Sequence, residues 1–271
     1  MVQRYPAIAF TALAIVPIYL ILGLCWLLRV PFEQLRPLKI LFAFTPLLSM
    51  IMVLSANNEK ARMNQIFSKW INRSSSPKWY FMGILFIPLV GLFSMLVYYF
   101  ISGTYISGHD FSSISNFLAL SIPLFLFPGI TEEFAWRGFL YDHLRHRFNL
   151  SLSAALVGIV WGLWHSFDFI IGNWKFSLPM LLGFSIYILS LSILICYFFE
   201  QSQQNILVAM LTHYSANAMI AFTPLWKGDN IMVFIFISLL AFCALMIILF
   251  KPGNKLGLTP YNIPNLSDQD L

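Results

Sequence analysis

Charged side chains are scarce in this sequence. Asp, Glu, Lys and Arg make up 10% of its 271 residues, whereas 59% of the residues are hydrophobic and the mean hydropathy is +0.77. A soluble domain has about 25% charged residues, because its surface faces water. So few charges argue against a soluble enzyme and against a disordered chain. Each long apolar stretch has the length of a membrane helix rather than of a barrel strand, so we expect an all-α polytopic membrane protein.

Cysteine is also scarce. Cys25, Cys196 and Cys243 lie far apart inside apolar stretches, which favours neither a disulfide framework nor a zinc knuckle. The net charge of +5 does not indicate a nucleic-acid partner, because the basic residues lie between apolar stretches, as they do in membrane loops. The expected environment is therefore a lipid bilayer. The first apolar stretch is too long for the core of a cleaved signal, so we interpret it as a retained span.

Apolar stretches of membrane-spanning length recur along the whole chain. About twenty apolar residues cross a bilayer core. The pattern predicts one membrane domain, residues 1–271, built as a bundle of about eight transmembrane helices. They are expected near 7–28, 38–56, 79–101, 117–141, 152–171, 178–199, 205–225 and 231–250.

The positions of Lys and Arg predict the orientation of the bundle. One set of alternate loops carries ten of them and the other set carries five, with Arg137 set aside as intramembrane. Basic residues favour the cytoplasmic side, so both termini are expected there. The basic connection 57–78 suits either an interfacial amphipathic helix or an ordinary loop. The polar tail 252–271 is expected to be flexible and cytoplasmic.

Ionisable residues inside apolar stretches are costly, so each one is a functional hypothesis by default. Glu133 and Arg137 are four residues apart with the acid first, which lets them neutralise each other on one helical face. Glu132 is then left without a partner on its own helix, as suits a general base. Hydrogen bonding to neighbouring helices is the alternative role, and it is favoured for Glu133 and Arg137. Asp168 and Glu200 fall near span ends, where a charge can reach the interface.

Two further pairs have the same spacing of four residues. Trp161 can form a wall beside His165. His213 and Asn217 can direct an imidazole and a carboxamide to one point, which suits the stabilisation of an oxyanion, although interhelical hydrogen bonding is the simpler role. With an α-helical rise of about 1.5 Å per residue, Glu132 and His213 lie roughly 15 Å from the cytoplasmic ends of their spans. The other two, His165 and Asn217, lie about one turn deeper, so all four are reachable from one cytoplasmic cavity.

The three segments in this order resemble the CPBP family of CAAX-processing and bacteriocin-processing (Abi) membrane proteins, which includes the type II CAAX prenyl endopeptidases. The resemblance covers a core at 117–225, and Trp161 takes a place where the family usually has Phe. It implies an intramembrane endopeptidase of the bacterial plasma membrane. In that activity Glu132 would activate water and His165 would help to position it. The remaining roles would be oxyanion stabilisation, by His213 and Asn217, and bracing of the site, by Glu133 and Arg137.

The substrate implied by the resemblance is a membrane-delivered peptide, either prenylated or a bacteriocin precursor. No metal is expected to be required, although Glu132, His165 and His213 would make a His₂Glu zinc set. A His-Glu-x-x-His helix is absent, and zinc ligation by Glu132 would require a second base. Two other functions stay open: a non-catalytic immunity or scaffolding protein, and a proton-coupled transporter. The lack of an internal repeat counts against the transporter.

Overall fold

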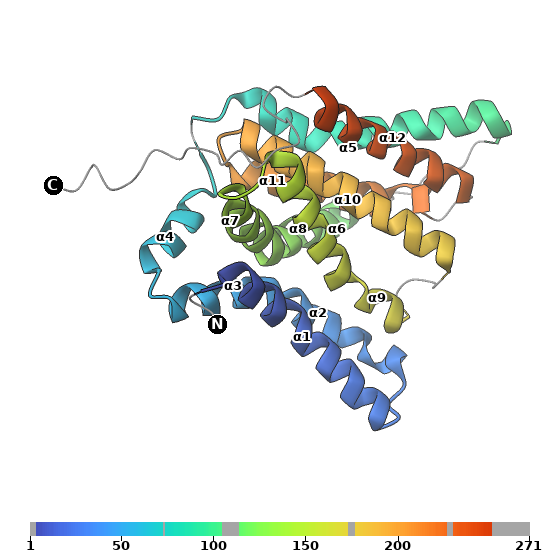
Figure 1. The fold of residues 1–271 in the computed structure, drawn as a ribbon. Helices are drawn as coiled ribbons and strands as arrows, with labels where there is room; N and C mark the ends of the chain where they lie inside the picture. Colours follow the sequence, from blue (N-terminus) through green and yellow to red (C-terminus); the bar gives the residue numbers. More distant parts are fainter. Residues whose placement is uncertain (1–3, 73, 105–113, 173–176, 227–229, 251–271) are drawn as a thin grey trace.

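The computed structural model describes residues 4–72, 74–104, 114–172, 177–226 and 230–250, and every regular element in this part is helical (Figure 1). Besides α-helices, it contains a π-helix, η2, and two 3-10 helices, η1 and η3. The order is α1 (Pro6–Leu27), η1 (Phe32–Leu38), α2 (Lys39–Ala43), α3 (Thr45–Ala56), α4 (Lys60–Ser68), α5 (Pro77–Ser102), α6 (Ile114–Pro128), η2 (Gly129–Tyr141), α7 (Asp142–Arg145), α8 (Leu150–His165), α9 (Phe167–Ile170), α10 (Leu178–Gln201), α11 (Ile206–Phe222), η3 (Pro224–Trp226) and α12 (Asn230–Phe250).

The helices follow the apolar stretches of the sequence. Six of them are long and apolar enough to cross a membrane: Pro6–Leu27, Pro77–Ser102, Asn116–Arg145, Leu150–Ile170, Leu178–Gln201 and Asn230–Phe250. The pair Glu33–Ala43 and Thr45–Ala56 makes a seventh span if it is counted as one helix bent by 40°. The stretch expected at 205–225 forms α11, which at 17 residues is shorter than the others. The prediction of an all-α polytopic membrane protein is confirmed.

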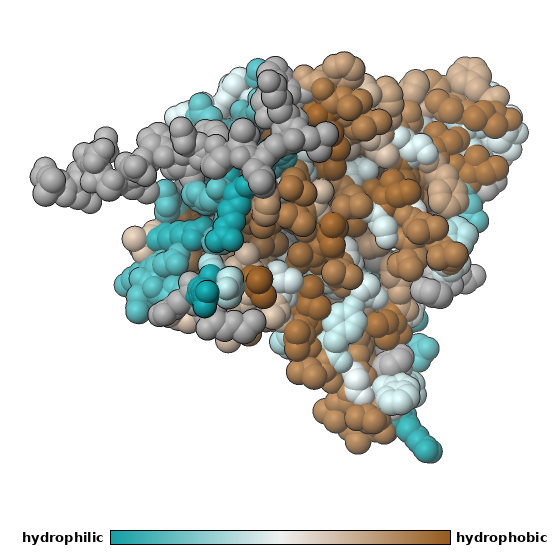
Figure 2. Space-filling model, in the orientation of Figure 1, coloured by the Kyte–Doolittle hydropathy of each residue, from teal (hydrophilic) through white to brown (hydrophobic). Residues whose placement is uncertain are grey.

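The outer face of the bundle is apolar. Figure 2 shows hydrophobic side chains over most of the visible surface and hydrophilic ones gathered at the end where α4 lies. Large aliphatic side chains such as Leu20, Leu89 and Leu182 are exposed on different helices. Such a surface suits contact with lipid chains rather than with water.

The core lies among η2, α8, α10 and α11. Every residue from Thr131 to Tyr141 of η2 is buried, so the charged segment 132–137 is fully enclosed by protein. Helices α8 and α10 approach closely because Gly158 has no side chain: a Cβ there would lie 3.0 Å from the Cβ of Ser192. Ser192 also donates a hydrogen bond to the carbonyl oxygen of Ala154 at 2.8 Å. This tight packing holds α8, which carries Trp161 and His165, against α10.

One local expectation is wrong. The sequence argument treated 129–141 as an α-helix, but this segment has the i→i+5 pattern of a π-helix. Pro128, which immediately precedes it, has no N–H to donate to an α-helical bond. A π-helix has more residues per turn and therefore less rise per residue. The α-helical rise consequently overestimates the depth of Glu132.

The basic connection 57–78 contains the short helix α4. Its Ile66 is buried, and the rings of Phe67 and Trp70 lie 5.2 and 6.2 Å from the ring of Phe134 in η2. Part of its apolar face therefore packs on the protein, while Ile71 is exposed. An interfacial position, like the cytoplasmic orientation of the termini, stays a prediction. The tail 252–271 lies outside the described residues.

Candidate active site

A cavity of about 420 Å³ brings the three polar segments together. Its walls come from α2, α6, η2, α8, α10 and α11, and much of its lining is apolar. Its lining also includes the four candidate catalytic residues and one supporting residue. The catalytic candidates are Glu132, His165, His213 and Asn217, and the supporting residue is Trp161. The helices bearing these residues are far apart in the sequence, so their convergence is a property of the fold.

Glu132 is held by the indole of Trp161. The indole N–H donates to Oε2 of the carboxylate at 2.7 Å, and Glu132 is 5% exposed. In the part of the chain that the structure describes, Oε1 of Glu132 makes no such bond. From the sequence, Trp161 was interpreted only as a wall beside His165. Its centroid does lie 5.8 Å from that imidazole, but its N–H to Glu132 is an additional role.

Glu133 joins Arg137 to His213. Its Oε1 accepts a hydrogen bond from Nη1 of Arg137 at 2.8 Å and lies 2.7 Å from Nδ1 of His213. The side chains of Glu133 and Arg137 are fully buried, and that of His213 is 4% exposed. The guanidinium also lies over the ring of Trp161, 4.5 Å from its centroid. The ion pair was expected from the spacing, whereas the bond to His213 was not.

The contact with Glu133 determines what His213 can offer to the cavity. A carboxylate accepts hydrogen bonds only, so Nδ1 of His213 has to carry a proton. In a neutral ring, Nε2 is then an acceptor; it becomes a donor only when the ring is an imidazolium. In that state the cluster of Glu133, Arg137 and His213 has a net charge of +1 beside the cavity.

His165 has its own carboxylate partner. Its Nδ1 lies 3.3 Å from Oδ2 of Asp168, and Oδ1 of Asp168 lies 2.9 Å from Nζ of Lys39. Asp168 is fully buried, so the expectation that its charge reaches the interface is wrong. The imidazole also packs against Trp164, with ring centroids 4.6 Å apart. Sequence reasoning named Asp168 but did not pair it with His165, although the two are three residues apart. It missed Lys39, which lies far from both in the sequence.

The three candidate zinc ligands do not form a metal-binding group in this arrangement. Among the described residues, no three His, Cys, Asp or Glu side chains are placed to hold a metal ion together. In this arrangement Oε2 of Glu132 accepts a hydrogen bond from the indole N–H of Trp161.

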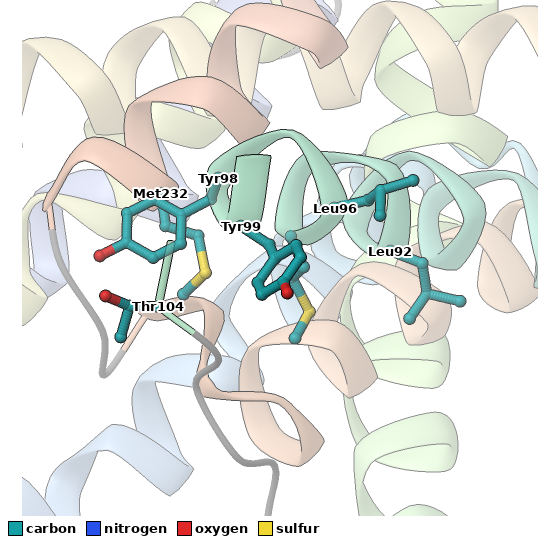
Figure 3. Close-up of a pocket in the computed structure, with 7 residues that line it drawn as sticks. Leu92, Leu96, Tyr98, Tyr99, Thr104 and Met232 are labelled. Carbon is teal, nitrogen blue, oxygen red and sulfur yellow. The ribbon is translucent and has the colours of Figure 1, made fainter. Parts of the chain in front are cut away.

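A second cavity provides a useful contrast. It encloses about 330 Å³ between α5 and α12 (Figure 3). Its lining consists of apolar, hydroxyl and phenol side chains: Leu92, Met95, Leu96, Tyr98, Tyr99, Thr104 and Met232. The described residues of its lining include no carboxylate, histidine or cysteine, so it lacks the polar cluster that lies beside Glu132. The cavity beside Glu132 is the candidate active site.

Comparison with known proteins agrees with this choice. Residues 114–219 match the family model described as type II CAAX prenyl endopeptidase Rce1-like, and all seven site residues fall inside that range. The chain is also 31% identical over 176 residues to the CAAX prenyl protease 2 of Methanococcus maripaludis. Both matches are to CAAX proteases of the CPBP type, and they support a likeness of this chain to that family. The alignment covers 60% of this chain and 63% of the relative from Methanococcus maripaludis. Helices α1 to α5 lie outside the range of the family match.

Proposed function

We propose that this protein is an intramembrane endopeptidase that hydrolyses a peptide bond in a membrane-delivered peptide. The observation that supports it most is the convergence of Glu132, His165, His213 and Asn217 on one cavity. The match of residues 114–219 to the type II CAAX prenyl endopeptidase Rce1-like family model adds support. We further propose a glutamate-type mechanism that requires no metal, because the described site residues bind one another rather than forming a ligand set.

In the first step, Glu132 acts as the general base. Its Oε1 accepts a proton from a water molecule in the cavity, while Trp161 keeps the carboxylate in place through Oε2. His165 accepts a hydrogen bond from the same water through Nε2 and orients it. The water oxygen bonds to the peptide carbonyl carbon, and the carbonyl oxygen becomes an oxyanion.

In the second step, the tetrahedral intermediate collapses. The positively charged cluster of Glu133, Arg137 and His213 stabilises the oxyanion through the protonated Nε2 of His213, and the carboxamide of Asn217 donates a second hydrogen bond. Reformation of the carbonyl breaks the carbon–nitrogen bond. The proton held by Glu132 passes to the leaving amine, so the carboxylate is regenerated and no other reactant is consumed.

The proposed substrate class follows from the walls of the cavity and from the substrate class named for the matched family and relative. The lining includes several aromatic and aliphatic side chains, such as Phe127, Phe184 and Ile220, which suit an apolar peptide or a prenyl chain. We therefore propose a prenylated peptide with a short C-terminal extension as the preferred substrate. A leader-bearing bacteriocin precursor is the other substrate to be tried in the same assay.

The test is peptide cleavage by purified protein in detergent or liposomes. Glu132→Ala is expected to abolish release of the C-terminal fragment, and His165→Ala and His213→Ala are expected to reduce it severely. Glu59→Ala, in the half-exposed pair with Arg62 outside the cavity, is the matched control and is expected to cleave normally. No cleavage of either peptide by the wild type would contradict the proposal and would favour a non-catalytic protein. Proton-coupled uptake without cleavage would favour a transporter.

A further inference from the structure

Helices outside the range of the family match form hydrogen bonds and an ion pair with the junction between α8 and α9, where His165 lies. The contacts connect α1 to α3 with residues 163–172, on both sides of His165. Tyr19 hydroxyl donates to the carbonyl oxygen of Leu163 at 3.1 Å and contacts the hydroxyl of Ser166. The remaining contacts are Trp164 Nε1 to Thr45 at 2.9 Å, Lys39 to Asp168 at 2.9 Å, and Arg36 to the carbonyl oxygen of Gly172 at 2.8 Å.

At this junction, Asp168 controls the protonation of His165. Oδ2 of the fully buried Asp168 carboxylate lies 3.3 Å from Nδ1 of His165. A carboxylate oxygen accepts a hydrogen bond from a protonated Nδ1 and repels the lone pair of an unprotonated one. The neutral imidazole is therefore held with its proton on Nδ1, and Nε2 is an acceptor. Since His165 lines the cavity, this is the tautomer that can accept a hydrogen bond from a water molecule there.

Lys39 supplies the cation that pairs with the carboxylate of Asp168. Removal of a carboxylate from water is costly unless a cation lies close to it, and Nζ of Lys39 lies 2.9 Å from Oδ1. The lysine side chain is 46% exposed, so its ammonium group is less desolvated than the fully buried carboxylate. The charge pair thus occupies one carboxylate oxygen and leaves the other for His165.

We infer that Asp168 and Lys39 are positioning residues that hold His165 in the tautomer required for orienting the attacking water. The inference rests on the proposed hydrolysis. It also assigns the N-terminal helices a part in the active site: α2 supplies Lys39, and the other contacts hold the α8–α9 junction around it. Neither residue lies in the three spaced segments that resemble the CPBP family.

The first test separates turnover from binding. In Asp168→Asn, the amide NH₂ can donate to Nδ1 and stabilise the wrong tautomer, so kcat is expected to fall about 10- to 100-fold with little change in KM. Lys39→Met is expected to lower kcat about tenfold, whereas Lys39→Arg retains the wild-type rate. Thermal unfolding midpoints are measured on all variants, to separate a loss of activity from a loss of stability. Because Lys39 is half-exposed, the fold is expected to tolerate substitutions there.

The second test asks whether Asp168 acts through His165. In a His165→Ala background, measured with excess enzyme over long incubations, Asp168→Asn is expected to cause no further loss of cleavage. Nitrogen NMR of histidine-labelled protein is expected to show the Nδ1-protonated tautomer of His165, and its loss in Asp168→Asn. A further loss in the His165→Ala background, or an unchanged tautomer, would overturn the inference.

The outcomes also distinguish this inference from the proposed function. If the wild type cleaves and Glu132→Ala does not, then a normal kcat for Asp168→Asn overturns the positioning role alone. If the wild type fails to cleave any peptide, the proposed function is lost, and the role of Asp168 in hydrolysis is lost with it.

Discussion

The buried cluster of Glu133, Arg137 and His213 predicts an asymmetry between two substitutions. Glu133→Gln retains the shape of the side chain but removes its charge. Among the described residues Arg137 has no other ion-pair partner, and its Nε and Nη2 already lack hydrogen bonds. An unpaired buried charge costs about 3–5 kcal/mol, so Glu133→Gln is expected to destabilise the protein by that amount.

Arg137→Met is expected to be milder. Glu133 would keep its contact with Nδ1 of His213, so its carboxylate is not left without a partner. The loss is then mainly that of a charge-assisted hydrogen bond, about 1.5–3 kcal/mol. In the double variant the orphaned cation is absent, so its stability is expected to be no lower than that of Glu133→Gln alone.

The assay is thermal unfolding of each variant in one detergent. For a chain of this size 1 kcal/mol corresponds to about 2–4 °C, so Glu133→Gln is expected to lower the midpoint by roughly 6–20 °C. Glu59→Gln, in a half-exposed pair with Arg62, is the control and is expected to cost about 0–1 kcal/mol. The reasoning is refuted if Glu133→Gln is as mild as this control, or if Arg137→Met is the more damaging change.

Three further outcomes follow from the site. Trp161→Phe removes the N–H bound to Glu132 but keeps an aromatic ring. Since a hydrogen bond is worth about 0.5–1.5 kcal/mol net, the cleavage rate is expected to stay within about tenfold of the wild-type rate. Complete loss of cleavage would contradict this. Asn217→Ala is expected to lower kcat about 100- to 1000-fold with little change in KM; a change confined to KM would exclude an oxyanion donor. Exhaustive chelation is expected to leave the cleavage rate unchanged, and a loss that added zinc restores would contradict the metal-free mechanism.

The parts of the fold and site that could be predicted are those set by local sequence. Apolar length placed the helices, because a bilayer core requires about twenty apolar residues. Spacing by four residues brought Arg137 to Glu133, and Trp161 to His165, because such residues share a helical face. The Glu133 pair forms even though η2 is a π-helix, which the α-helical pattern did not indicate.

The contacts between segments could not be predicted in this way. The bond from Trp161 to Glu132 spans 29 positions and that from His213 to Glu133 spans 80, and both depend on how α8 and α11 pack on η2. The pairing of Lys39 with Asp168 depends on the packing of the N-terminal helices around the α8–α9 junction. A charge near the end of an apolar stretch has the same sequence pattern whether it faces lipid headgroups or a buried partner.

The central claim is that Glu132 is the base that activates water, and Glu132→Gln tests it most directly. The amide can still accept the N–H of Trp161 and fills the same space, so the fold is expected to be preserved, but it cannot take a proton from water. General-base catalysis contributes about 100- to 10,000-fold, and the rate of hydrolysis of a prenylated peptide is expected to fall by that factor with an unchanged unfolding midpoint. Cleavage by Glu132→Gln at the wild-type rate would contradict the account.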